Sequence, residues 1–141
     1  MRRRSGFTLI EMMIVLAIIA ALAATLVPIA MNALNQAKVT NNLTDLESIR
    51  MAAMQYYYKE NDLSVANGAT GTFSPAYLKW ENLSQPGLYE FTNAGEASLT
   101  ITVNLNSENL ANALEVQFPA DSNQASGSVI GNNFVVEYIF R

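Results

Sequence analysis

The feature that most constrains this chain is an apolar run near its N-terminus. Residues 12–31, MMIVLAIIAALAATLVPIAM, are 20 consecutive residues without a charged side chain. As a helix, a segment of that length spans a hydrocarbon core of ~30 Å. Arg2, Arg3 and Arg4 precede it, and basic residues on one flank of such a helix favour the cytoplasmic side for that flank. The sequence therefore predicts a single-pass membrane helix with a cytoplasmic N-terminus.

A cleavable secretory signal is the alternative interpretation of the same segment. The basic residues, the apolar run and Ala21-Leu22-Ala23 resemble the three regions of such a signal. Two observations argue against a secretory signal: the apolar run continues for eight residues beyond Ala23, and Glu11 directly precedes the run. Pro28 lies inside the run, where it removes one helical hydrogen bond and predicts a helix kink. Membrane helices tolerate such a residue.

The helix is predicted to continue well beyond the apolar run. Residues 32–60 contain neither proline nor glycine, and apolar side chains recur among them at helical spacing. We therefore predict one helix from about Thr8 to about Glu60, with an amphipathic second half that packs on a core. At least two of the three tyrosines 56–58 are expected to face that core. The expected core stripe consists of Val39, Leu43, Leu46, Ile49, Ala53, Tyr56 and Tyr57.

The remaining residues predict a small antiparallel sheet. Residues 61–74 are predicted to be a loop, and 76–80 a short strand or turn. Alternation of apolar and polar residues predicts strands over 88–92 and 97–105, and a closing hairpin of 128–130 with 134–140 around Gly-Asn-Asn. Residues 107–116 predict a short helix capped by Ser107, and 120–127 a polar loop. The predicted fold class is α+β, with the sheet packed on the C-terminal half of the long helix.

Composition excludes several classes of function. The chain has no cysteine and no histidine, so it lacks disulfides, Cys/His zinc sites, thiol nucleophiles and the commonest general base. The net charge is −4, and removing Arg2, Arg3 and Arg4 leaves five cations against twelve carboxylates, or −7. Such a chain does not attract nucleic acid through its general charge. No phosphate-binding or dinucleotide-binding motif is present. We therefore expect no enzyme activity, no cofactor, no metal and no specific nucleic-acid partner.

Several short patterns have a functional and an ordinary interpretation. Residues 121–127 have oxygen ligands at alternate positions but lack the third acidic ligand of a calcium loop, which favours a solvated connection. Asn42 and Asn82 each begin a possible N-glycosylation pattern, which arises easily by chance in an Asn-rich chain. Trp80 is expected to be a packing residue.

The hexapeptide Gly6-Phe7-Thr8-Leu9-Ile10-Glu11 follows a short basic leader and opens the apolar run. In residue types, order and position it resembles the class III signal of type IV prepilins and pseudopilins. Pro28 occupies the helix-kink position of that family. The resemblance is strong over residues 1–35 and implies the pilin fold, in which one long N-terminal helix carries a small sheet on its outer half.

The resemblance also implies a maturation pathway. A prepilin peptidase would remove the leader, residues 1–6, by cutting between Gly6 and Phe7, and would then N-methylate Phe7. Residues 7–31 would be the transmembrane helix and later the filament core, and residues 32–141 the amphipathic continuation and globular head. The subunit would remain in the bacterial inner membrane until an ATP-driven assembly machine extracts it into the filament.

The function implied by the resemblance is that of a filament subunit assembled with other copies and other pilins. It would build a type IV pilus outside the cell for motility, adhesion or DNA uptake. The alternative is a pseudopilin in the periplasmic filament of a type II secretion system. The chain lacks the C-terminal disulfide of many pilins, which leaves the pseudopilin interpretation open, whereas the unconvincing calcium loop argues mildly against it.

Glu11 has a hypothetical role in assembly. A carboxylate at the edge of a membrane segment is disfavoured unless it is paired. Cleavage after Gly6 creates a new amine on Phe7, with an ordinary pKa of about 8. Pairing of Glu11 with the Phe7 amine of a neighbouring subunit would neutralise both charges and fix the register of the assembly.

Overall fold

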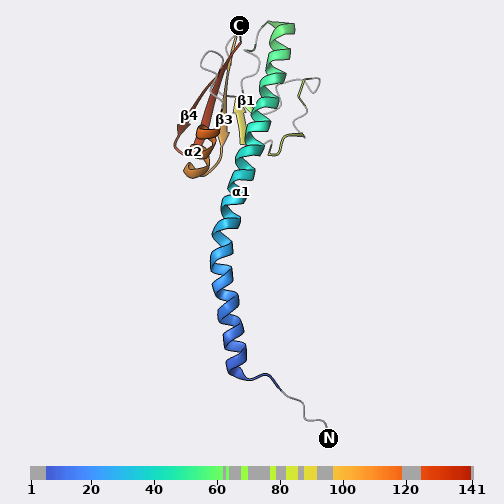
Figure 1. Cartoon of the computed structure of the whole chain (residues 1–141). Coiled ribbons are helices and arrows are strands. Elements are labelled where there is room, and N and C mark those ends of the chain that lie inside the picture. Colours follow the sequence, from blue (N-terminus) through green and yellow to red (C-terminus); the bar gives the residue numbers. More distant parts are fainter. Residues whose placement is uncertain are drawn as a thin grey trace. The chain divides into compact units, whose positions relative to one another are not determined.

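The computed structural model describes residues 6–61, 63, 68–69, 77–78, 82–85, 88–91, 97–118 and 125–140. The elements are α1 (Leu9–Glu60), β1 (Gly68–Ala69), β2 (Tyr89–Phe91), β3 (Ser98–Asn104), α2 (Glu108–Gln117), β4 (Ala125–Ile130) and β5 (Asn133–Ile139) (Figure 1). The chain divides into two compact units, Met1–Ala37 and Lys38–Arg141. The second unit, called the head below, contains all the strands.

Helix α1 confirms the predicted long helix. Its 52 residues begin one position after the predicted start and end at the predicted Glu60. The helix is not interrupted at Pro28. At its end, Asn61 has a positive φ of 55°, and its N–H donates to the Tyr57 carbonyl at 2.8 Å. This is the left-handed conformation in which helices commonly end, and asparagine tolerates it better than most residues.

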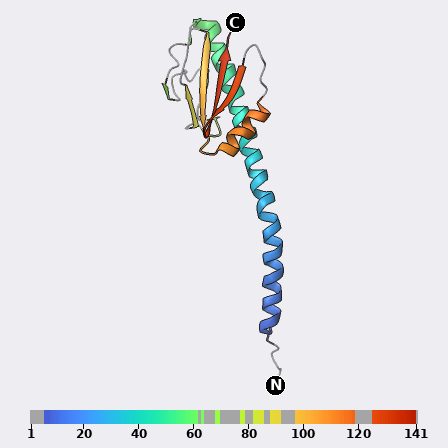
Figure 2. The same ribbon diagram turned by 90° about the vertical axis from the view of Figure 1, so that its left-hand side faces the viewer.

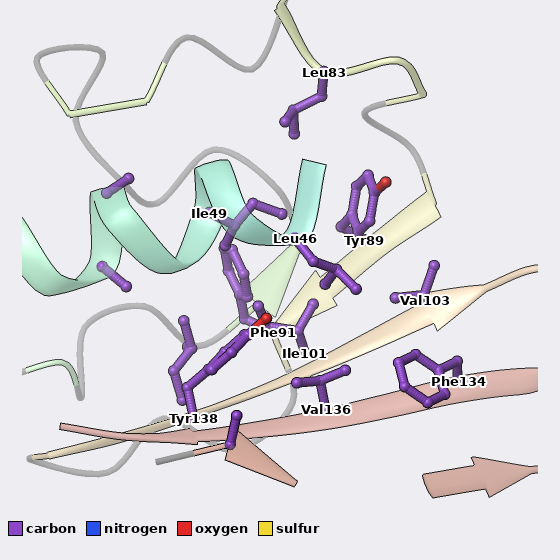
Figure 3. Packing of buried hydrophobic residues seen from close by; sticks show 14 of the residues in the cluster. Leu46, Ile49, Leu83, Tyr89, Phe91, Ile101, Val103, Phe134, Val136 and Tyr138 are labelled. Carbon is purple, nitrogen blue, oxygen red and sulfur yellow. The ribbon is translucent and has the colours of Figure 1, made fainter. Parts of the chain in front are cut away.

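The core of the head lies between one face of α1 and one face of the sheet (Figures 1 and 2). Leu46 and Ile49 on α1 are fully buried with Ile101 and Val136 on the strands (Figure 3). The predicted stripe is confirmed, since Tyr56 and Tyr57 also pack against this core whereas Tyr58 is exposed. The helix residues buried in the head are Val39, Asn42, Asp45, Leu46, Ile49, Ala52 and Ala53.

The strands form a five-stranded antiparallel sheet in the order β1-β2-β3-β5-β4. Alternate residues of each longer strand are buried, as the period-two pattern predicts. In β3 these are Leu99, Ile101 and Val103, which lie opposite Tyr138, Val136 and Phe134 of β5. Strand β5 is thus inserted between β3 and β4, and it pairs with β3 over its full length and with β4 from Asn133 to Tyr138.

The β4–β5 hairpin confirms the predicted closing hairpin but is longer than predicted. Strand β4 begins at Ala125, inside the stretch that was predicted to be a polar loop. Gly127 faces the ring of Phe134, and a Cβ atom at this position would lie 2.6 Å from the Phe134 Cζ atom. The first half of the strand is absent from the prediction because the small residues that allow this close approach carry no apolar alternation.

One polar cluster is buried in the head and joins α1 to the sheet. Asp45, only 5% exposed, accepts hydrogen bonds from the Tyr89 hydroxyl at 2.8 Å and the Ser84 N–H at 2.9 Å. The Ser84 hydroxyl donates to the other oxygen of the same carboxylate at 3.3 Å. The Tyr89 hydroxyl also lies 3.3 Å from Oδ1 of Asn42. Burial, together with the adjacent Asp45, raises the pKa of Tyr89 above its ordinary value.

The remaining sequence predictions have mixed outcomes. Ser107 precedes α2 as predicted, but its side chain makes no capping hydrogen bond. Asn42 is 4% exposed, which excludes a glycan there in the folded head, whereas Asn82 is exposed. Ser126 and Gly127 of the weak calcium pattern lie in β4. Trp80 and residues 121–124 are outside the described residues.

Candidate functional site

The candidate functional site is the segment that leads into α1. Gly6 and Phe7 precede the helix, and both are exposed. A Cβ atom at Gly6 would meet no atom within 4 Å, so the Gly6–Phe7 bond stands clear of the rest of its unit. A protease cleft that encloses both sides of this bond would therefore meet no steric obstacle from the described residues around it.

Thr8 and Glu11 form a reciprocal capping box at the start of α1. The Thr8 backbone N–H and hydroxyl each donate to Glu11 Oε2, at 2.7 Å in both cases. In return the Glu11 N–H donates to the Thr8 hydroxyl oxygen at 3.3 Å. A Ser/Thr followed three residues later by Glu is the sequence signature of this motif, which satisfies backbone donors that have no partner inside the helix. The motif explains why α1 begins at Leu9.

Thr8 is the site residue that the sequence prediction missed. The sequence analysis gives Glu11 a single role, an ion pair with another subunit, although its spacing from Thr8 is the capping-box spacing. The structure gives the Glu11 side chain a second, local role. Both Thr8 bonds go to Oε2, and Oε1 has no hydrogen-bond partner among the described residues. One carboxylate oxygen thus remains available to a further donor.

The N-terminal half of α1 exposes its apolar side chains. Leu16, Leu22, Leu26 and Ile29 are each more than half exposed, as are most of their large neighbours. In the part of the chain that the structure describes, α1 is the one helix long and apolar enough to cross a membrane. None of its most apolar window is buried within the fold. This surface needs an apolar surrounding, which lipid or the helices of other subunits can provide.

Pro28 lies inside this apolar half, far from the capping box in sequence. The structure keeps Pro28 within a continuous helix, and the predicted kink at this position stays a prediction. The nearby Thr25 hydroxyl donates to the Leu22 carbonyl at 2.9 Å, which satisfies that polar group without solvent. Across the described residues, no group of three or more Asp, Glu, His or Cys side chains is placed to hold a metal ion.

Comparison with known proteins agrees with this geometry. Residues 1–27 match the family described as the prokaryotic N-terminal methylation motif. The type II secretion system core protein G of Pseudomonas aeruginosa is 47% identical over 60 residues. The N-terminal segment of this chain therefore carries a prokaryotic methylation motif and is similar to part of a type II secretion protein. The comparison with solved structures gives no significant match.

The extent of these matches limits what they establish. The aligned residues make up 43% of this chain and 42% of the Pseudomonas relative, so the chain spans less than half of the relative's length. The methylation motif includes Gly6, Phe7, Thr8 and Glu11 together with most of the apolar run. The α+β fold with one long N-terminal helix and a small antiparallel sheet is consistent with the pilin fold.

Proposed function

We propose that this chain is a pilin-like structural subunit that is held in the bacterial inner membrane by α1 and then polymerises into a filament. The observation that carries the proposal is the combination of a methylation motif at residues 1–27 with an apolar helix that its own fold leaves uncovered. Lipid would cover residues 7–31 before assembly, and neighbouring α1 helices would cover them afterwards. Ala20, Ala21, Ala23 and Ala24 are small enough to allow close helix packing.

Maturation is proposed to occur at Gly6 and Phe7. A prepilin peptidase would cut the exposed bond between them and methylate the new amine of Phe7. The cut would also remove Arg2, Arg3 and Arg4, which hold the N-terminus at the cytoplasmic face. Mass spectrometry of the protein from its native cell tests this step. We expect a mature chain that begins with N-methylated Phe7, and a start near Ala24 would instead identify a secretory signal.

Two filaments are candidates for the assembled form. The sequence favoured a type IV pilus, used in motility, adhesion or DNA uptake. The Pseudomonas relative, a type II secretion protein by name, favours a secretion pseudopilus, and so does the absence of cysteine. Deletion of the gene separates the two. Loss of exoprotein secretion with pili intact supports the pseudopilus, whereas loss of twitching or transformation with secretion intact supports the pilus.

Glu11 is proposed to pair with the Phe7 amine of a neighbouring subunit. The capping box supports this role, because it occupies Oε2 and leaves Oε1 without a partner. The box also gives the carboxylate hydrogen bonds while the subunit waits in the membrane, where an unsatisfied charge is costly. The same residue can therefore be tolerated before assembly and used during it.

A pair of Glu11 variants separates the two roles. Gln accepts the Thr8 N–H bond as Glu does, so Glu11→Gln keeps the capping box but removes the charge. Glu11→Ala removes both. If charge pairing drives assembly, both variants lose filaments, but only Glu11→Ala increases amide exchange in the first turn of α1. Normal filaments from Glu11→Gln would disprove the pairing role, and measuring leader cleavage in each variant controls for failed maturation.

A further inference from the structure

A cavity of about 170 Å³ opens on the head, away from the N-terminal site in sequence. Its walls come from α1, the segment 82–85, the start of β2, the end of β3 and the start of α2. Three leucines contribute apolar surface. The polar lining residues are Lys38, Asn41, Asn42, Ser84, Gln85 and Asn106.

The charge of the lining is positive, in contrast to the chain as a whole. Lys38 is the single charged residue of the lining, and the chain carries a net charge of −4. No carboxylate lies within salt-bridge distance of the Lys38 ammonium among the described residues. An unpaired cation at a cavity without acidic side chains selects for an anionic ligand.

Asn42 provides a second observation that points to a ligand. Its side chain lines the cavity although the residue is only 4% exposed. One end of the amide contacts the Tyr89 hydroxyl at 3.3 Å, and the other end has no partner within the described part of the head. Buried polar groups are almost always hydrogen-bonded, to protein or to water, so this end of the amide is available to a group that enters the cavity.

The other polar groups of the lining are suited to the same ligand. Asn41, Gln85 and Asn106 each carry an NH₂ group with two donors. A carboxylate accepts about four hydrogen bonds and forms stronger ones than a neutral acceptor does. Ser84 is fixed in place by its two hydrogen bonds to Asp45, which holds this wall of the cavity against α1.

The size of the cavity limits the ligand to a small group. A protein cavity of ~150 Å³ holds one benzene molecule, whereas pockets for drug-sized ligands and cofactors are ~300–1,000 Å³. A volume of about 170 Å³ therefore accepts a group of roughly six heavy atoms. A short aliphatic carboxylate, or the side chain of one glutamate, is of this size.

We propose that this cavity binds a carboxylate group, with its charge at Lys38 and the lining amides and its aliphatic part against the leucines. Two sources can present that chemistry: a small free carboxylate, or an acidic side chain of a neighbouring copy of this chain. The inference goes beyond the proposed function, and its central test does not depend on filament formation.

The test is a titration of the full-length, ¹⁵N-labelled protein in detergent micelles with butyrate and with its neutral isostere butyramide, followed by NMR. We expect saturable shifts at the side-chain amides of Asn42 and Asn106 with butyrate. Butyramide is expected to bind about five-fold more weakly, because it lacks the charge that strengthens each hydrogen bond. Equal binding of the two probes, or no saturable shift with butyrate, would overturn the proposal.

Two pairs of variants make the test specific to this cavity. Lys38→Gln is expected to reduce butyrate binding to the level of butyramide. Lys59→Gln, in the last turn of α1 and outside the cavity lining, is expected to leave butyrate binding unchanged. Asn106→Gly removes one lining amide, and its φ of 55° suits glycine, so the backbone is not strained. Asn61→Gly is the matched control, since Asn61 has the same φ and lies outside the cavity lining. Unaltered butyrate binding by Lys38→Gln would overturn the proposal.

Self-association measured by analytical ultracentrifugation identifies whether the bound carboxylate group comes from a free molecule or from a neighbouring copy of this chain. If a neighbouring copy supplies the carboxylate, then both saturating butyrate and Lys38→Gln weaken self-association. If the ligand is a free carboxylate, Lys38→Gln reduces butyrate binding to the level of butyramide and leaves self-association unchanged. Either result supports the site.

Discussion

At the scale of single residues, Asp45 decides how the segment 82–85 and β2 are fixed to α1. Its carboxylate is buried without a cation within salt-bridge distance among the described residues, and it depends on three donors from Ser84 and Tyr89. Hydrogen bonds of this kind offset the cost of removing the carboxylate from water. The donors in turn depend on it, because they have no other strong acceptor at comparable distance.

Replacing Asp45 is therefore predicted to destabilise the head. Asp45→Ala leaves the Tyr89 hydroxyl and the Ser84 N–H without their acceptor, and we expect a loss of ~2–4 kcal/mol in the free energy of unfolding. Thermal unfolding followed by near-UV circular dichroism measures this loss. Glu47→Ala, an exposed acidic position on the same helix, is the control and should change stability by less than ~0.5 kcal/mol. Equal effects of the two variants would contradict this account of Asp45.

Two buried tyrosines predict a loss of stability at high pH. Burial raises the pKa of Tyr89 and of Tyr138 above the ordinary value of 10.0. The unfolded chain therefore releases these two protons at lower pH than the folded head does. The free energy of unfolding is then unaffected below about pH 10 and falls above it, by up to ~1.4 kcal/mol per pH unit for each tyrosine.

Urea denaturation between pH 8 and pH 11 measures this dependence. Tyr138→Phe removes one of the two titrations, and its hydroxyl donates no hydrogen bond among the described residues, so the slope above pH 10 should fall by about half. Tyr58→Phe is the matched control at an exposed position and should leave the slope unchanged. A slope that Tyr138→Phe does not alter would contradict the prediction.

At the scale of elements, the β4–β5 hairpin depends on the close approach of a glycine to an aromatic ring. Gly127→Ala would place a Cβ atom 2.6 Å from the Phe134 Cζ and 3.1 Å from the Phe118 Cδ1. The rings must move to accommodate it, and overpacking of this kind costs ~1–3 kcal/mol. Chemical denaturation should show that loss, whereas Ser128→Ala, at an exposed position of the same strand, should be nearly neutral.

Most elements could be predicted because their hydrophobic periodicity is strong. Helix α1 has no glycine and, after Glu11, no charge to interrupt its first half, and its second half has a regular apolar stripe. Strands β3 and β5 alternate cleanly between apolar and polar positions. Strand β4 was predicted too short because Ala125, Ser126 and Gly127 are small, and small residues give no alternation.

The N-terminal site and the cavity of the head were less predictable, because they depend on contacts between side chains that only the folded structure shows. Gly6, Phe7 and Glu11 were recognised from their order, but the bond between Thr8 and Glu11 was overlooked, although its spacing is local. Asn42 was considered only as a glycosylation acceptor, yet it stands in the buried stripe between Val39 and Leu46. The cavity brings together residues 38–42, 84–85 and 105–110, and only the packing of the head makes them neighbours.

At the scale of the whole molecule, the two units need different surroundings. The head buries its own core, whereas residues 9–31 of α1 leave their apolar side chains uncovered. Leu16→Arg places a charge within the apolar run and should reduce membrane insertion, because a central arginine costs ~2.5–3.5 kcal/mol on insertion scales. Alkaline carbonate extraction of cell membranes measures the fraction inserted.

Val116→Arg is the control for this prediction. Val116 is also an exposed apolar residue, 85% accessible, but it lies on α2 in the head, where water already surrounds it. The same charge should therefore leave membrane extraction unchanged at this position. Equal release of both variants would mean that α1 is not the anchor.

The central position of β5 in the sheet has a consequence for the timing of folding. Residues 133–139 are made among the last of this sequence, yet they separate β3 from β4 and pair with both. Until they are made, the strands made earlier lack the partner that joins them. The sheet of the head therefore closes late, only after β5 has been made. A chain that stalls before that point would present open strand edges to its neighbours.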